Sequence, residues 1–275
     1  MHDAKELADY LAGRTESLNL DHAALLLATL EFPDLDPAPF LALLDSHAAE
    51  LRQRIAPAAG GPAFVAEANR YLFDELGFHG NTADYYNPAN SCLNQVLAAR
   101  TGIPITLSVV YLEIARRLER PLTGIGLRGH FVIRYDDGDY CTYIDAFHGG
   151  RLLDAVACLD LARQVAGAEA ARRPGALAPV TNRQILLRMV HNLRGIYFSR
   201  RAHRKALEVL DLLVAAHPDS AEEYKQRGLV RLQLEQARAA RADFERYVAL
   251  APDAADRAEI EEQLVTLKRY GATLN

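Results

Sequence analysis

Residues 129–145 read Gly-His-Phe-Val-Ile-Arg-Tyr, then Asp-Asp-Gly-Asp, then Tyr-Cys-Thr-Tyr-Ile-Asp. Two runs of β-favouring residues flank a polar tetrad with Asp-Gly at its centre, the strongest short-range signal for a two-residue hairpin turn. If Asp137-Gly138 forms that turn, counting outwards along the two strands places His130 opposite Asp145. Directly opposed residues point to the same side of a sheet, with Cβ atoms roughly 4.5–5.5 Å apart. The stretch therefore predicts a histidine–carboxylate pair.

A histidine held by a carboxylate fits two interpretations. In a nucleophile–base–acid triad, the carboxylate orients the imidazole, which takes a proton from the nucleophile. In a structural interpretation, the pair is an incidental cross-strand ion pair of the hairpin. The hairpin alone does not decide between them.

The composition is that of an ordinary globular protein. The chain has 275 residues, half of them hydrophobic, and a net charge of −5, which fits one large domain or two ordinary ones. This charge argues against a dedicated nucleic-acid-binding protein, which usually carries a basic stripe. No run approaches the ~18 apolar residues of a membrane span, and no secretory signal is visible. We therefore expect a cytoplasmic protein that binds neither nucleic acid nor membrane.

Three segments with different patterns precede residue 183. Residues 1–78 place apolar side chains at three- and four-residue spacing, which predicts a helical N-terminal part of the first domain. Residues 79–166 combine a polar loop with helices over 91–100 and 105–118, a strand over 122–127, the hairpin, and a helix over 152–165. This mixture predicts an α+β core. Residues 167–182 are rich in Ala, Arg, Gly and Pro, which predicts a linker.

A helical repeat pattern fills residues 183–275. Pro218 and Pro252 lie 34 residues apart, which is the tetratricopeptide period. The tetratricopeptide pattern calls for a large, a small, a small, an aromatic and a proline residue in turn. The second unit has Tyr224, Gly228, Ala240, Phe244 and Pro252 at these positions, and the first unit has Leu193, Tyr197, Ala206, Leu210 and Pro218. Arg227 and Arg231 depart from the pattern. The repeats predict an all-α domain that binds a protein or peptide partner.

The three cysteines differ as candidate nucleophiles. Cys141 lies four residues from Asp145 on the same strand, roughly 13 Å away at ~3.3 Å per residue, and Cys158 falls in an apolar helix, where a small core residue is expected. Cys92 would lie in the first turn of the helix over 91–100, where the helix dipole lowers a thiol pKa. A buried structural cysteine is still the commoner outcome for any one cysteine.

Hydroxyl groups offer a weaker candidate. Thr106 and Ser108 lie near the start of the helix over 105–118, and Ser108 is the alternative nucleophile. Hydroxyl side chains at such positions usually cap the helix or bond back to its carbonyl groups, so we favour a structural role for both.

No metal or cofactor motif emerges. His79, His130 and His148 are scattered and lack an HExxH or CxxC partner. Residues 124–129 contain the GxGxxG spacing of a dinucleotide site, but a strand rather than a helix follows it. We therefore expect neither a metal nor a cofactor.

Five motifs occur in a characteristic order, namely Tyr85-Tyr86-Asn87-Pro88-Ala89-Asn90-Ser91, Leu93-Asn94-Gln95-Val96-Leu97, Gly102-Ile103-Pro104-Ile105-Thr106-Leu107-Ser108, Gly126-Leu127-Arg128-Gly129-His130-Phe131 and Ile144-Asp145-Ala146-Phe147-His148-Gly149-Gly150. Together they resemble the bacterial SirB family, which joins a transglutaminase-like domain to C-terminal tetratricopeptide repeats. The resemblance covers most of the chain from about Phe64 onwards.

The resemblance implies a papain-like α+β core, and it maps His130 and Asp145 onto the superfamily's catalytic His and Asp on adjacent antiparallel strands. The superfamily's catalytic Cys opens the helix before the sheet. Here that helix, over 105–118, holds Pro104, Thr106 and Ser108 at its start but no Cys, and Cys92 lies one helix earlier. Arg128 replaces the Pro that the family carries before Gly-His.

These observations lead to two main hypotheses. In the first, the chain is a protein- or peptide-binding module with a regulatory role and a vestigial His130–Asp145 site. In the alternative, it is a thiol hydrolase or acyl-transferase acting on amide bonds, in which Cys92 attacks, His130 acts as base and then acid, and Asp145 orients His130. A pure scaffold, in which the repeats do everything, is a third and weaker hypothesis.

Overall fold

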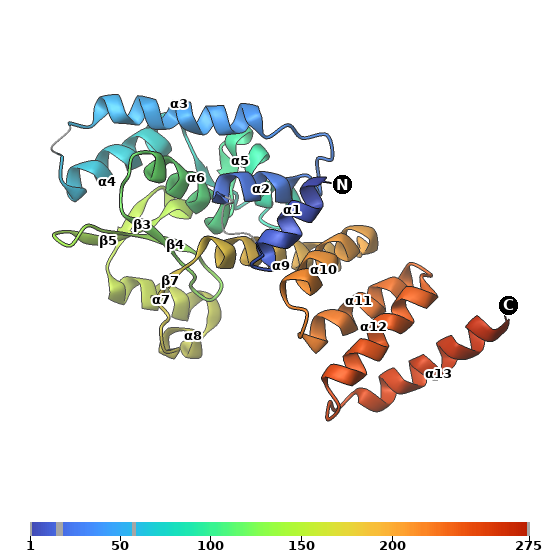
Figure 1. Ribbon diagram of the computed structural model, residues 1–275. Helices are drawn as coiled ribbons and strands as arrows, with labels where there is room; N and C mark the ends of the chain where they lie inside the picture. Colours follow the sequence, from blue (N-terminus) through green and yellow to red (C-terminus); the bar gives the residue numbers. More distant parts are fainter. Residues whose placement is uncertain (1, 15–18, 57–58, 274–275) are drawn as a thin grey trace. The chain divides into compact units, whose positions relative to one another are not determined.

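The computed structural model describes residues 2–14, 19–56 and 59–273 (Figure 1). The chain divides into two compact units. One consists of Met1–Glu16 together with Val190–Asn275, and is called here the helical unit; the other consists of Ser17–Met189, and is called the sheet unit. None of the described helices has the length and apolar character needed to cross a membrane.

Helices occupy the first half of the sheet unit, interrupted by two very short strands. In chain order the elements are α2 (Leu20–Ala28), α3 (Ala38–Arg54), α4 (Gly61–Asn69), a π-helical turn (Arg70–Glu75), β1 (His79–Gly80), a 3₁₀ turn (Pro88–Ser91), α5 (Leu93–Ala99), β2 (Thr101–Gly102) and α6 (Pro104–Arg117). The strands β1 and β2 pair in parallel. Helix α6 is the most deeply placed, since every residue from Pro104 to Ala115 is buried.

A five-stranded antiparallel sheet follows, in the spatial order β6-β5-β4-β3-β7. The strands are β3 (Leu122–Ile125), β4 (Val132–Asp136), β5 (Cys141–Asp145), β6 (Arg151–Leu153) and β7 (Pro179–Val180). Helix α6 packs against β3 and β4, while α7 (Ala155–Ala166) and α8 (Ala168–Arg172) cover the other face (Figure 1). The predicted α+β class is confirmed.

The hairpin turn holds four residues, Asp137–Tyr140, and not two. The Asp137 carboxylate accepts backbone N–H groups within the turn at 2.8 and 3.2 Å, and Gly138 takes a positive φ of 91°. Arg134 therefore pairs with Tyr143 rather than with Cys141, so the predicted register was wrong by two residues. Because side chains alternate with a period of two, this shift leaves each residue on its predicted face of the sheet.

Two other segments differ from their predicted structure. Leu152 and Leu153 form strand β6 with Arg151 and do not begin the predicted helix, which starts at Ala155. Residues 167–182, predicted as a linker, contain α8 and β7, and β7 pairs with β3. Pro179 is tolerated in β7 because this is an edge strand, where a missing N–H group breaks no ladder.

The helical unit contains the repeats. Its helices are α1 (His2–Leu11), the second half of α9 (Asn182–Ser199), α10 (His203–Ala216), α11 (Ala221–Gln233), α12 (Ala237–Leu250) and α13 (Arg257–Thr273). Helix α1 packs against α10. Helices α11 and α12 approach closely at Gly228, where an added Cβ would lie 2.6 Å from the Phe244 ring. This contact explains the small residue at that repeat position.

The arginines that depart from the repeat pattern bind buried carboxylates. Arg227 holds Asp243 of α12 through Nε and a terminal nitrogen, with the shortest contact at 2.7 Å, and Arg231 reaches the same carboxylate at 2.7 Å. Arg227 also contacts Asp211 of α10 at 2.9 Å. Asp243 is 2 % exposed, so these ion pairs connect three helices of the unit through a nearly water-free carboxylate.

Candidate functional site

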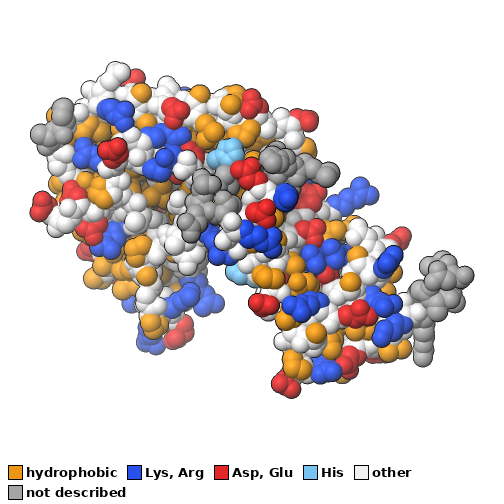
Figure 2. Space-filling view, in the orientation of Figure 1, with side chains coloured by type: hydrophobic (Ala, Val, Ile, Leu, Met, Phe, Trp, Pro, Cys, Tyr) orange, Lys and Arg blue, Asp and Glu red, His pale blue; other side chains and the backbone are white. Residues whose placement is uncertain are grey.

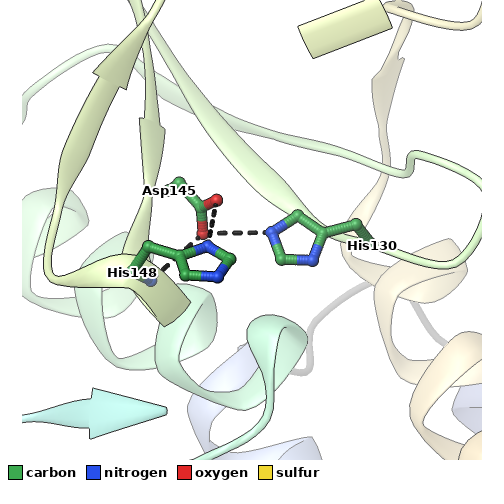
Figure 3. A group of neighbouring side chains, drawn as sticks. All are labelled: His130, Asp145 and His148. Carbon is green, nitrogen blue, oxygen red and sulfur yellow. Dashed lines mark hydrogen bonds and ion pairs between the residues drawn. The ribbon is translucent and has the colours of Figure 1, made fainter. Parts of the chain in front are cut away.

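The predicted histidine–carboxylate pair is present where β4 begins and β5 ends. His130 Nε2 lies 3.0 Å from Asp145 Oδ1, and both side chains are buried (Figure 3). His130 follows Gly129, whose φ of +78° is a conformation that favours glycine. An added Cβ on Gly129 would also lie 2.6 Å from Val165 of α7. The absence of a side chain at Gly129 therefore lets the backbone pass close to α7 just before His130 and strand β4.

A second histidine completes the site. After β5, Ala146–His148 form a 3₁₀ turn, and Asp145 Oδ1 accepts the backbone N–H groups of Phe147 and His148 at 3.2 and 3.3 Å. This turn brings His148 Nδ1 to 2.7 Å from Asp145 Oδ2 (Figure 3). Treating His148 as a scattered residue was therefore wrong. The signal in the sequence was the spacing Asp-x-x-His directly after a strand and before Gly149-Gly150.

The two imidazoles hold Asp145 as a carboxylate. Burial raises the pKa of Asp145, but the hydrogen bonds and charges of His130 and His148 lower it by a larger amount. The pKa of Asp145 therefore lies below its ordinary value. A neutral imidazole donates through one ring nitrogen and accepts through the other. Since His130 uses Nε2 and His148 uses Nδ1 toward Asp145, the remaining nitrogens, His130 Nδ1 and His148 Nε2, are the ones left to act on a ligand.

Aromatic rings surround the pair. Phe147 stands edge-on to His130 at 6.1 Å between ring centres, and it contacts Tyr85 at 5.9 Å, which in turn contacts Tyr86 at 5.3 Å. We call Tyr85, Tyr86 and Phe147 the aromatic ledge. The Tyr86 side chain is 69 % exposed, and the His148 side chain is about half exposed. The aromatic rings of the ledge and the His148 imidazole therefore meet solvent at one place.

A hydrogen-bond network fixes the loop that carries the ledge. The Asn90 side chain donates to the carbonyls of Asp84 and Tyr85 at 2.7 and 3.1 Å and accepts from Asn81 at 3.0 Å. The Asn90 carbonyl in turn accepts the Thr106 hydroxyl at 2.7 Å. Asn90 is buried, so the polar loop of the sequence is an ordered platform anchored on α6.

The candidate nucleophiles are bonded to the backbone. Cys92 is fully buried as the residue before α5, and its Sγ donates to the Pro88 carbonyl at 3.4 Å. The Ser108 hydroxyl is also fully buried and donates to the Pro104 carbonyl at 2.7 Å, one turn back in α6. The Thr106 hydroxyl likewise donates to backbone carbonyls, those of Asn90 and Ile103. The structure thus brings together His130, Asp145 and the unpredicted His148.

The other two cysteines lie in the sheet and in the helix that covers it. Cys158 of α7 is buried against it, and burial raises the pKa of its thiol to about 12. Cys141 is exposed near the turn of the hairpin.

The same residues offer a metal-ligand set. One ligand atom from each of His130, Asp145 and His148 lies within 4.8 Å of the others, the one such cluster among the residues that the structure describes. Two histidines and one carboxylate are donors suited to Zn²⁺ or Fe²⁺. However, both Asp145 oxygens already accept from imidazole and N–H groups, so an ion would have to replace these hydrogen bonds. The donor types fit a metal, and the hydrogen bonding satisfies the site without one.

Arg188 reaches the site from far along the sequence. One of its terminal nitrogens donates to the His130 carbonyl at 2.7 Å, and its guanidinium lies 5.5 Å from the centre of the Phe131 ring. Burial lowers the pKa of Arg188. Sequence reasoning missed this residue because it lies in the first half of α9, with no motif to connect it to the hairpin.

Comparison with known proteins supports this architecture. Residues 38–191 match the model of the transglutaminase-like superfamily, and residues 193–265 match a tetratricopeptide-repeat model. A UPF0162 protein of Xylella fastidiosa (strain Temecula1) is 38% identical over 255 residues, which covers 92% of this chain and 91% of that protein. A UPF0162 protein of Pseudomonas aeruginosa is 28% identical over 248 residues, or 89% of each chain.

Human F-box only protein 21 is 38% identical over 172 residues, which is 58% of this chain but 26% of that longer protein. The predicted combination of a transglutaminase-like domain with tetratricopeptide repeats is therefore confirmed. The chain belongs to the transglutaminase-like superfamily and, by its match over 91% of the Xylella relative, to the UPF0162 proteins.

Proposed function

We propose that this chain is a binding module with a regulatory role. In this proposal the sheet unit binds an extended peptide segment across the aromatic ledge and His148. The tetratricopeptide repeats of the helical unit bind a partner protein, as such repeats do through their stacked helices. The His130–Asp145 pair is a vestige of the superfamily's catalytic site that now orders the binding surface.

One observation carries the proposal. The groups able to attack an amide, Cys92 and Ser108, are fully buried and donate to backbone carbonyls, whereas imidazole and phenol rings are exposed at the site. Rigid aromatic side chains bind peptides well because they supply large contact areas with little loss of conformational entropy. The exposed side chains of the site are thus better suited to binding a peptide than to cleaving one.

Selection of peptides tests the proposal. Random displayed peptides are selected on the immobilised full-length chain, and the enriched peptides are then measured against Tyr86→Ser and His148→Ala. We expect each variant to bind about tenfold or more weakly, the loss typical of a central contact residue. Val156→Ser is the matched control, since Val156 is 67% exposed on α7 and is not part of the ledge. Equal binding by all four proteins would refute the site.

The same peptides test the thiol-enzyme alternative. Incubation with the wild-type chain and with Cys92→Ala, followed by mass spectrometry, detects cleavage or acyl transfer. We expect intact peptides from both proteins. Products that form with the wild type but not with Cys92→Ala would replace the binding proposal by the Cys92–His130–Asp145 enzyme.

A further inference from the structure

A pocket of about 580 Å³ lies next to His130 in the sheet unit. One wall is the loop Gly126–Gly129, which leads directly into His130. The opposite wall is formed by α8 and the residues after it, Arg173 and Pro174, and Arg188 closes the pocket. The pocket therefore shares two parts with the candidate site: the Gly129–His130 backbone and the Arg188 side chain that binds it.

The pocket wall is strongly basic. Four arginines line it, Arg128, Arg172, Arg173 and Arg188, against a single carboxylate, Glu169. Glu169 pairs with Arg172 at 3.2 Å, and both side chains are exposed. In the described part of the chain, no carboxylate lies within ion-pair distance of the other three arginines. Figure 2 shows basic side chains gathered where α8 lies. The pocket thus carries positive charge that the protein does not neutralise.

Arg188 is the arginine of this pocket whose side chain is held in a fixed position. Its position is fixed by the hydrogen bond to the His130 carbonyl and by the Phe131 ring. A guanidinium taken largely out of water loses hydration, and an ion pair is the usual compensation. Because the described residues supply no such partner, the site favours an anion brought by a ligand. A planar guanidinium can hold a carboxylate or a phosphate through paired hydrogen bonds.

We propose that this pocket binds the carboxylate side chain of an acidic residue in the peptide that the proposed function places on the aromatic ledge. The inference rests on that proposed function and adds a preference for Asp or Glu. A volume of about 580 Å³ has room for one or two side chains, and the net charge of the whole chain is −5. A long polyanion such as nucleic acid would be repelled by the rest of the chain, which favours a single acidic side chain.

Fluorescence anisotropy tests the preference on the full-length chain. The probes are a labelled peptide that carries the selected aromatic-binding motif and one Glu, and its Gln-for-Glu counterpart. We expect the Glu peptide to bind about tenfold more tightly, and Arg128→Gln or Arg173→Gln to remove most of that advantage while leaving the Gln peptide unaffected. These two arginines are exposed, so neither change threatens folding. Arg163→Gln, an exposed arginine of α7 outside the pocket, is the matched control.

The outcomes separate the inference from the function on which it rests. Equal binding of both peptides to the wild type would overturn the acidic preference and leave peptide binding intact. Binding of neither peptide would overturn the proposed function and the inference together. Competition by inorganic phosphate at the peptide's own concentration, or tighter binding of a short single-stranded RNA, would overturn the carboxylate assignment. Loss of the Glu preference with Arg163→Gln would show a general charge effect in place of a pocket.

Discussion

His130 and Asp145 are hydrogen-bonded at 3.0 Å without being opposite each other in the sheet. The register of β4 and β5, continued by one pair, places Val132 opposite Asp145. His130 reaches the carboxylate diagonally, from two residues before that position. A diagonal neighbour on the same face is within reach of a long or aromatic side chain, and the Arg188 bond to the His130 carbonyl holds the backbone in place for this contact.

Asp145→Asn removes the negative charge of the carboxylate to which both imidazoles are hydrogen-bonded. We expect a loss of about 1–3 kcal/mol in the free energy of unfolding near neutral pH, because a buried amide replaces the charged acceptor. The measurement is urea unfolding. His148→Ala is the control and costs less, since its side chain is half exposed. An Asp145→Asn variant as stable as the wild type would show that the hydrogen bonds contribute nothing to the fold.

The pH dependence of unfolding reports the same carboxylate. The pKa of Asp145 lies below the ordinary 3.8 in the folded state, so the unfolded chain takes up a proton first as the pH falls. Its stabilisation is complete above pH 3.8 and is lost as the pH falls through the folded pKa. We expect the wild type to lose stability more steeply than Asp145→Asn below that pH. Parallel curves in that range would contradict the depressed pKa.

Gly80→Ala tests the packing beneath the ledge. An added Cβ would lie 2.5 Å from the Phe147 ring and 2.7 Å from its carbonyl, so Phe147 must shift from its place in the ledge. Overpacking of this kind costs about 1–3 kcal/mol, and we expect weaker peptide binding as well. Thermal unfolding and anisotropy measure the two effects. Gly195→Ala is the control, since its site in α9 is open and Ala favours a helix by ~1 kcal/mol.

Thiol labelling distinguishes the three cysteines. Cys92 and Cys158 are fully buried and Cys141 is exposed, so we expect iodoacetamide to modify Cys141 alone in the native chain. Mass spectrometry counts the adducts, and all three cysteines should react in urea. Cys141→Ser should therefore show no native adduct. Rapid native labelling of Cys92 would revive the thiol-enzyme hypothesis.

Asp243 supports the repeats through Arg227 and Arg231. Asp243→Ala leaves two arginines beside an empty, buried position, and we expect a loss of about 3–5 kcal/mol in the unfolding free energy. The control is Asp219→Ala. Asp219 is 91% exposed and its contact with Arg246 is 3.7 Å long, so its removal should leave the stability unchanged. Denaturant unfolding followed by helix content measures both, and similar effects of the two substitutions would contradict the network.

Sequence reasoning succeeded where the signal was local. The Asp-Gly turn with its flanking strands predicted the His130–Asp145 pair, and the proline spacing predicted the repeats. The turn length could not be counted, because the Asp137 carboxylate replaces a backbone acceptor and extends the turn to four residues. The pair survived this error because a shift of two residues keeps both side chains on one face.

The sequence by itself therefore determined the class of the fold, the repeats and one histidine–carboxylate pair, since these depend on periodicity and on neighbours in the chain. Only the tertiary structure decided what surrounds the pair. The 3₁₀ turn brings His148 onto Asp145, the packing of Phe147 over Gly80 places the ledge, and α9 returns Arg188 to the His130 carbonyl. The burial of Cys92 likewise depends on the packing of α5. Such contacts join residues far apart in sequence, and packing against the whole unit fixes them.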